Sequence, residues 1–298
     1  MEILLPAIVR GVGIGSTYAL LAVSFVVIYR ATEVVNFAQP ALMMLGIYFT
    51  SFFAVGTGLP FPVAVLLAML VTGGVGALTE RIAMRPLVGQ PVFSAAMVTV
   101  GVFAVLTVVA NWLIGPNLII VGDPWGLSMV EVGGFRFTQL DVAKTVISLG
   151  AVAIVGLLLK QSRIGLAMRA TSLDQETALA QGVNVGRMFS IAWALAAALA
   201  ALAGMLIGSG AGGVEATAAL VALKALPVII VGGIDSIQGA VVAGLVIGVA
   251  ESLTRAYQPL HAPWLGANFD VIVPYLILVV GLMIRPYGLF GTPEVQRV

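Results

Sequence analysis

The stretch FSAAMVTVGVFAVLTVVANWLI, residues 93–114, contains no charged side chain. A helix of about 20 apolar residues is long enough to cross the roughly 30 Å of hydrocarbon in a bilayer. The whole chain is as apolar as this stretch suggests: 60% of its 298 residues are apolar, 9% are charged and the mean hydropathy is +1.12. In a soluble protein about a quarter of the residues are charged. The apolar runs lack the two-residue alternation of a barrel strand. The sequence therefore predicts an all-α polytopic membrane protein.

Nine apolar runs are candidates for membrane helices, which gives eight to nine crossings in a single transmembrane domain of residues 1–298. The second run begins near Asn36, Gln39 and Pro40, so we expect it to be broken or only partly inserted. The seventh contains Lys224 and Pro227 and is also irregular. The nine runs are 5–29, 37–56, 61–80, 93–114, 142–160, 188–208, 217–233, 238–254 and 270–285.

Basic residues beside the runs collect on one side of the predicted bundle, and basic loops stay in the cytoplasm. Threading nine runs leaves chiefly Arg136 and Arg255 at the outer loops. The segment 161–187 and the C-terminus are then cytoplasmic, and the N-terminus lies outside. The basic residues on the cytoplasmic side are Arg30, Arg81, Arg85, Lys160, Arg163, Arg169, Arg187, Arg285 and Arg297.

The polar segment RATSLDQETALAQGVNVGR, residues 169–187, lies between two apolar runs. Ser172 and Gln175 have the three-residue spacing of a capping box, and Gly182 stands where a C-cap glycine is expected, which predicts a short helix over 173–181. Such a helix is marginal alone because nucleation is costly, so it must pack on something. Two interpretations stay open: a loop helix packed on its own bundle, and a docking helix for a cytosolic partner.

Three blocks of the sequence resemble the permease subunits of the branched-chain amino acid ABC importer family, the H-type subunit in particular. The blocks are YALLAVSFVVIYRATEVVNFAQPALMMLGIY at 18–48, SRIGLAMRATSLDQETALAQGVNVGRM at 162–188 and LKALPVIIVGGIDSIQGAVVAGLVIGVAES at 223–252. Within the second block, Glu176, Ala178 and Gly182 are similar to the E-A-A-x3-G loop by which such permeases engage their ATPases, with Thr177 in place of the first alanine.

This resemblance implies a short cytoplasmic coupling helix within the loop 161–187 of the helical bundle. Two residues depart from the family pattern: the family usually has Asn-Phe-Ala-His-Gly where this chain has NFAQP at 36–40, so Gln39 and Pro40 replace His and Gly and leave the exact substrate open. The residues that the resemblance assigns to contact with the ATPase are Ser172, Asp174, Glu176, Ala178 and Gly182.

Polar residues inside the apolar runs have both a structural and a functional interpretation. Asn36 and Gln39 either tie helices together or, with the adjacent Phe37, line the path of a solute. A lysine in the middle of a membrane costs roughly 2.5–3.5 kcal/mol, so Lys224 should face protein or water. It either forms a buried pair with Glu251 or Glu215, or marks a polar point on the path.

No site for catalysis, a cofactor or a metal ion is expected. The sequence contains no G-x4-G-K-[ST] phosphate loop, no cysteine and a single histidine, His261. It also has no basic stretch typical of nucleic-acid binding. An energy source would therefore have to be a separate ATPase subunit.

The resemblance implies an inner-membrane permease of an ATP-driven importer for branched-chain or other small hydrophobic amino acids, with amides, urea and small carboxylates as further candidates. The implied partners are two cytosolic ATPase subunits, an identical or similar second permease, a soluble binding protein and membrane lipid. Two other classes remain open: a secondary transporter or channel driven by an ion gradient, which would favour buried acidic residues, and a membrane scaffold without a polar path.

Overall fold

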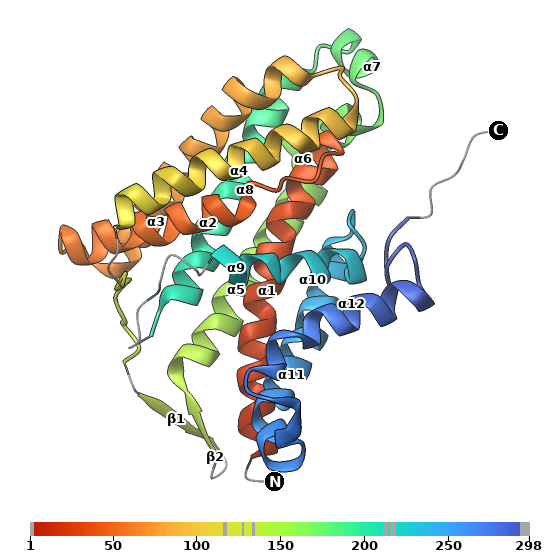
Figure 1. Ribbon diagram of the computed structural model, residues 1–298. Helices are drawn as coiled ribbons and strands as arrows, with labels where there is room; N and C mark the ends of the chain where they lie inside the picture. The colour runs from red at the N-terminus through yellow and green to blue at the C-terminus, as the bar shows by residue number, and fades with distance from the viewer. Residues whose placement is uncertain are drawn as a thin grey trace. The chain divides into compact units, whose positions relative to one another are not determined.

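A computed structural model describes residues 3–115, 118–126, 128–132, 135–210, 214 and 219–292 (Figure 1). Helices account for most of these residues, as the apolar runs predict. The long helices are α1 (Leu4–Thr32), α2 (Gln39–Ser51), α3 (Phe61–Thr79), α4 (Val92–Ile114), α5 (Gln139–Gln161), α8 (Val185–Gly208), α11 (Ile237–His261) and α12 (Val273–Ile284). The short ones are α6 (Arg163–Leu173), α7 (Gln175–Ala180), α9 (Ala219–Leu223) and α10 (Ala225–Gly232).

Shorter elements extend or join these helices. A π-helical turn, η1 (Phe52–Gly56), follows α2, and another, η2 (Glu80–Met84), follows α3 and leads into the 3-10 turn η3 (Arg85–Leu87). Two 3-10 turns, η5 (Pro263–Leu265) and η6 (Phe269–Val271), precede α12. An antiparallel hairpin that the sequence analysis did not predict joins β1 (Met129–Val132) to β2 (Phe135–Thr138), with Val130 opposite Phe137.

In the described residues each of the nine predicted runs is helical, and most ends agree within a few residues; the seventh run, predicted to be irregular, forms two short helices, α9 and α10, that are interrupted at Lys224. In the described part of the chain, seven helical stretches are long and apolar enough to cross a membrane. The seventh and ninth runs give shorter apolar helices, Val221–Gly232 and Phe269–Ile284. Two differences are informative. Helix α11 ends at His261 rather than at 254, and α2 is unbroken because Pro40 lies in its first turn, where a missing N–H costs little.

The chain divides into two compact units, one of residues 1–23, 125–150 and 223–298 and one of residues 24–124 and 151–222. In the first unit, α10 packs on α11 and α12, and η6 contacts α11. Helix α1 lies against α11 at a glycine contact: a Cβ built on Gly15 would be 2.6 Å from the carbonyl oxygen of Gly244. Such close backbone approach is typical of membrane helix pairs.

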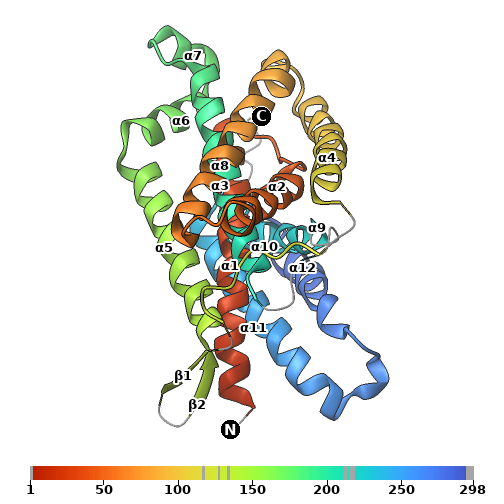
Figure 2. The ribbon, with the colours of Figure 1, turned by 90° about the vertical axis from the view of Figure 1, so that its left-hand side faces the viewer.

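In the second unit, α8 packs against α2 and α3, and α2 also contacts α3 and α4 (Figure 2). A Cβ built on Gly76 of α3 would lie 2.6 Å from the carbonyl oxygen of Trp193 in α8. The core of this unit lies along α8, where Trp193, Leu206 and a series of alanines are buried. Helices α6 and α7 lie at the ends of α5 and α8 that the segment 161–187 connects.

Candidate functional site

The segment 161–187 folds as two helices rather than one. Helix α6 continues to Leu173, so Ser172 lies in its last turn and donates its hydroxyl to the carbonyl of Arg169. The predicted cap at Ser172 is therefore wrong. Asp174 is the N-cap of α7, because its Oδ1 accepts the amides of Glu176 at 2.9 Å and Thr177 at 3.0 Å. An aspartate is a strong N-cap because it satisfies amides that have no partner inside the helix.

The C-terminal end of α7 agrees with the prediction. Gly182 has a φ of +82°, in the left-handed region that glycine adopts without strain. The amide of Gly182 donates to the carbonyl of Leu179 and the amide of Val183 to that of Ala178, which is a Schellman motif. The helix is therefore capped at both ends although it has only six residues.

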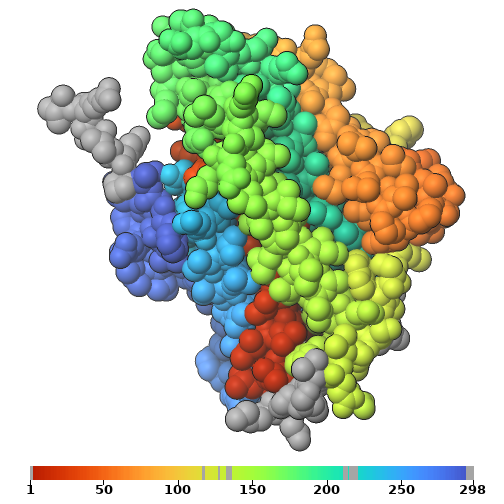
Figure 3. Space-filling model, turned by 180° about the vertical axis from the view of Figure 1, so that it is seen from behind, coloured from red at the N-terminus to blue at the C-terminus, as the bar shows by residue number. Residues whose placement is uncertain are grey.

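Only part of α7 is buried against its own unit. Ala178 is 3% exposed, whereas Glu176 is exposed. Figure 3 shows the segment that contains α7, in green, at the surface of the molecule. Two leucines beside it are also exposed, Leu173 at 87% and Leu179 at 58%. The outer face of the segment thus combines an acid with apolar side chains.

The amides of Asn36 and Gln39 form a buried network in the second unit. Asn36 Nδ2 donates to Gln39 Oε1 at 2.9 Å, and Gln39 Nε2 donates to Ser24 Oγ at 2.7 Å and to the carbonyl of Ala196 at 2.9 Å. Both side chains are fully buried. These bonds join α1, α2 and α8, as the structural interpretation of the two amides requires. The amide of Phe37 donates to Thr99 Oγ1 of α4 at 3.0 Å.

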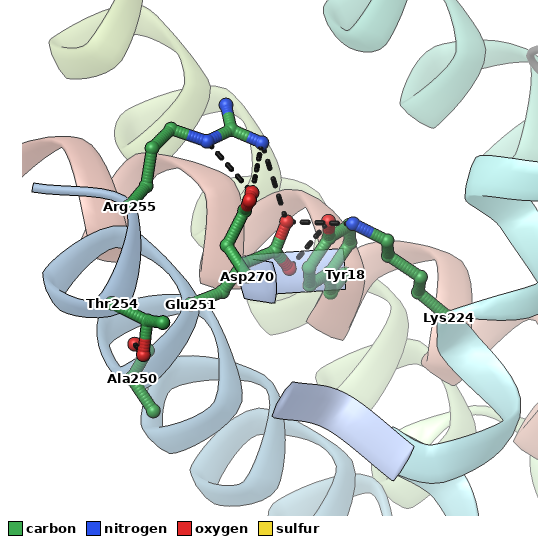
Figure 4. A network of polar contacts seen from close by, with 7 residues as sticks. All are labelled: Tyr18, Lys224, Ala250, Glu251, Thr254, Arg255 and Asp270. Carbon is green, nitrogen blue, oxygen red and sulfur yellow. Dashed lines mark hydrogen bonds and ion pairs between the residues drawn. The ribbon is translucent and has the colours of Figure 1, made fainter. Parts of the chain in front are cut away.

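A second polar network, in the first unit, contains Lys224 (Figure 4). Lys224 Nζ lies 2.6 Å from Glu251 Oε1, and the hydroxyl of Tyr18 donates to Glu251 Oε2 at 3.0 Å. Arg255 approaches the same carboxylate at 3.8 Å and binds Asp270 through Nε and Nη2 at 2.8 and 2.5 Å. The pair of Lys224 with Glu251 is therefore confirmed, and Glu215, the alternative partner, lies outside the described residues.

The network is close to neutral, since two acids face two bases. Glu251 and Asp270 are 2% and 6% exposed, and Lys224 is 7% exposed. The ammonium of Lys224 also lies 5.8 Å from the centre of the Tyr18 ring, a favourable cation–π distance. Each buried charge thus has a partner of opposite sign, which is what makes it tolerable in a membrane.

One further cluster was missed by the sequence analysis. Glu80, fully buried at the end of α3, binds Arg85 through two hydrogen bonds of 3.3 and 3.0 Å. Arg85 also donates to the carbonyl of Gly186 and to Ser190 Oγ in the first turns of α8. The sequence predicts for Arg85 only a place among the basic residues of the cytoplasmic side.

Comparison with known sequences decides which family the chain belongs to. The family model described as "Branched-chain amino acid transport system / permease component" matches residues 7–282. The chain belongs to this permease family. It is a multi-pass bacterial inner-membrane protein of the ABC transporter class.

Relatives with names in this family align with the permease over almost its whole length. It is 28% identical to the high-affinity branched-chain amino acid transport system permease protein LivH of Escherichia coli, over 97% of this chain and 96% of that protein. It is 29% identical to the corresponding protein BraD of Pseudomonas aeruginosa, over 99% and 98%. Among solved structures, PsaBC from Streptococcus pneumoniae in complex with Fab has a TM-score of 0.51 and 13% identity, over 96% of this chain and 93% of that one, which shows a shared fold.

The N-cap of α7 gives the first prediction for the permease. Hydrogen bonds from the Thr177 hydroxyl, and then from the Thr177 and Glu176 amides, hold the pKa of Asp174 below its ordinary value of 3.8. Because this pKa is lower in the folded state, the capping stabilisation is present above pH 3.8 and is lost as the pH falls through the folded-state pKa. Asp174→Ala should therefore speed amide hydrogen exchange over 175–180 at neutral pH, where the capping carboxylate of the native protein is ionised.

Asp174→Asn is the matched control, since an asparagine keeps an acceptor oxygen at the N-cap. It should retain slower exchange than the alanine variant. Equal exchange in the alanine variant and the unchanged protein would contradict the capping role.

Proposed function

We propose that this permease moves branched-chain or other small hydrophobic amino acids into the cytoplasm as the transmembrane subunit of an ATP-driven importer. The observation that carries the proposal is α7: a separately capped helix in the segment between the long apolar helices α5 and α8, with Glu176, Ala178 and Gly182 at the spacing of the ATPase-docking loop. Ala178 anchors this helix to its own unit, and Glu176, Leu173 and Leu179 are left for a partner.

In this proposal the ATPase subunits bind the outer face of 161–187 on the cytoplasmic side. A helix of six residues is too short to be stable alone. Its two caps keep it folded, which gives a rigid surface against which a partner can push. The exposed leucines would be covered by the partner, since apolar side chains outside the membrane are more stable when buried.

The resemblance to the importer family supports two further partners. A second permease, identical or similar, would complete the path, and a binding protein outside the membrane would deliver the solute. Asn36, Phe37, Gln39 and Lys224 remain our candidates for residues that line the path. The hydrogen bonds of Asn36 and Gln39 are made within the protein in this conformation, so contact with a solute requires a rearrangement of α1, α2 and α8.

Buried acids do not favour the alternative of a secondary transporter. In the part of the chain that the structure describes, the buried carboxylates are Glu80, Glu251 and Asp270, and each has an arginine or lysine partner. Carboxylates bound to cationic side chains in this way are typical of structural ion pairs.

Reconstitution of the complete transporter tests the proposed function. Proteoliposomes containing the permease, its ATPase subunits and its binding protein should take up labelled leucine only when ATP and the binding protein are present. Valine and isoleucine should compete, and the competition of urea, small amides and short carboxylates would define the substrate range. Uptake driven by an ion gradient without the ATPase would contradict the proposal.

The substitution Gln39→His addresses selectivity. It introduces the usual family residue at a position where the native amide bonds Ser24 and Ala196. An imidazole cannot reproduce both donors and the acceptor at once. We therefore expect a modest change in transport rate and no change in the preferred solute. Competition uptake with one fixed binding protein measures this, and a switch of preferred solute would show that the permease, not the binding protein, selects.

A further inference from the structure

The cluster of Glu80, Arg85 and Ser190 joins the end of α3 to the start of α8 within the second unit. Glu80 is fully buried, and the side chain of Arg85 is 39% exposed. Glu80 also accepts a hydrogen bond from the hydroxyl of Ser190. Burying a carboxylate is costly unless it is paired and its oxygens accept hydrogen bonds, and here both oxygens do so.

Arg85 links two elements through one planar group. Its Nη2 lies 3.0 Å from Glu80 Oε2, 3.0 Å from the carbonyl oxygen of Gly186 and 2.8 Å from Ser190 Oγ. A guanidinium has several donors in a fixed plane, which a lysine ammonium cannot imitate. The cluster is therefore a geometric connection between η2 and α8 as well as an electrostatic one.

The position of the cluster relates it directly to α7. Helix α8 begins at Val185, a few residues after α7 ends, and its first turn is capped by Asn184, whose Oδ1 accepts the amide of Arg187 at 2.9 Å. Gly186 and Ser190 lie in the first two turns of the same helix. Any displacement of α7 thus reaches α8 at the residues that Arg85 holds.

A small cavity lies at the same place. Its volume is about 200 Å³, and its lining includes Gln175 from the first turn of α7 together with Glu80, Phe189 and Trp193. Gln175 in the first turn of α7 thus lines the same cavity as Glu80 of η2 and Phe189 of α8. The hydrogen bonds of Arg85 span the two elements beside this space.

Beyond the cluster, α3 and α8 are in close contact. A Cβ built on Gly76 would approach Trp193 O and Ala197 Cβ at 2.6 Å, and one on Gly73 would approach Ala194 O at 3.1 Å. Helices at this distance have little freedom to tilt independently, because packed interfaces deform in discrete steps rather than continuously. A force applied to both helices at one end would move them together.

We infer that Glu80, Arg85 and Ser190 form a clamp that makes α3 and α8 respond as one body to movement of α7. Arg85 and Ser190 are thus positioning residues for transport, and they act without contact with the solute. This inference rests on the proposed function, since it assumes that an ATPase moves α7. The clamp converts a push on a short surface helix into a displacement of two membrane helices, of which α8 contacts the Gln39 network through Ala196.

The test compares solute transported with ATP hydrolysed in proteoliposomes that contain the complete transporter. Arg85→Lys keeps a positive charge beside Glu80 but loses the planar set of donors. Ser190→Ala removes the hydroxyl that bonds Glu80. Both variants should still bind the ATPase, because α7 is unchanged. The number of solute molecules moved per ATP should fall roughly two- to thirtyfold, the usual range for substitutions on a coupling path.

Ser209→Ala is the matched control. Ser209 lies just past the other end of α8, and its hydroxyl bonds the carbonyl of Met205 in its own helix. This variant should keep the native ratio of transport to hydrolysis. Ser190→Ala provides an independent result if Arg85→Lys lowers the yield of folded protein.

The possible results separate the clamp from the proposed function. A lower ratio with normal ATPase binding supports the clamp. An unchanged ratio in both variants, including one in which uptake and hydrolysis fall in proportion, overturns it, because the cluster then contributes only to folding. If the unchanged permease neither binds an ATPase nor shows ATP-dependent uptake, it is the proposed function that fails.

Discussion

Glu176→Lys is expected to abolish ATP-driven uptake while the permease still inserts and folds. Glu176 is exposed on α7 and makes no ion pair within the described part of the chain. Its replacement therefore removes no internal contact, but reverses the charge of the surface on which the ATPase is proposed to dock. Like charges placed across an interface cost several kcal/mol, which is enough to prevent assembly at ordinary concentrations.

The substitution also has a small effect on the stability of α7, which must be separated from the loss of ATPase binding. Glu176 lies in the first turn of α7, where a negative charge favours the helix and a positive one opposes it. Glu176→Gln removes the charge without reversing it and should bind the ATPase with intermediate affinity. Glu131→Lys is the matched control. Glu131 is an exposed acid on the hairpin, and its ion pair with Arg136, at 3.6 Å, lies on the surface, where such pairs contribute little.

Co-purification of the ATPase and uptake in proteoliposomes measure the effect. Uptake at the native rate in Glu176→Lys would contradict the docking role of α7. Equal losses in Glu176→Lys and Glu131→Lys would mean that the change of net charge, not its place, is responsible.

Lys224→Met is expected to lower the yield and thermal stability of the folded permease. The substitution leaves Glu251 buried with only the Tyr18 hydroxyl and a more distant Arg255. Removing one partner of a buried ion pair costs about 3–5 kcal/mol. The membrane cost of the lysine itself, roughly 2.5–3.5 kcal/mol, is already offset in the folded protein by that pair.

The double variant Lys224→Met with Glu251→Gln distinguishes the two interpretations of Lys224. It removes both charges and keeps an acceptor for Tyr18, so stability should largely return. Thermal unfolding in detergent gives the comparison, with Lys160→Met as the control at an exposed lysine. Native stability in the single variant together with loss of uptake would instead assign Lys224 to the transport path.

Most of the fold was predictable because the membrane imposes a simple requirement. Each long apolar run must satisfy its backbone as a helix, and each of the nine runs is helical over most of its described residues, the seventh as the two short helices α9 and α10. The errors lie where hydropathy is uninformative. Helix α11 continues past 254 through Arg255 and Gln258, and its polar last turns resemble a loop in composition. The hairpin at 129–138 is too short to show a clear strand pattern.

The candidate site was predictable only where contacts are local. Gly182 was recognised because a left-handed C-cap has one dominant residue type. Ser172 and Asp174 are both good caps, and only the continuation of α6 to Leu173 decides between them. Glu80 and Arg85 are five residues apart, which does not match the three- or four-residue spacing of an α-helical pair. They meet because η2 is a π-helical turn, and their third partner is 105 residues further along.

The buried charge pairs also constrain the order of events during synthesis. Arg85 is made five residues after Glu80, so this pair can form as soon as the segment leaves the ribosome. Lys224 precedes Glu251 by 27 residues, which corresponds to about one to five seconds at roughly 5–20 residues per second. During that interval the lysine lacks Glu251, the carboxylate that it binds in the folded protein. We therefore expect α10 to be stable in lipid only after α11 has been made, so that the two helices enter the bilayer as a pair.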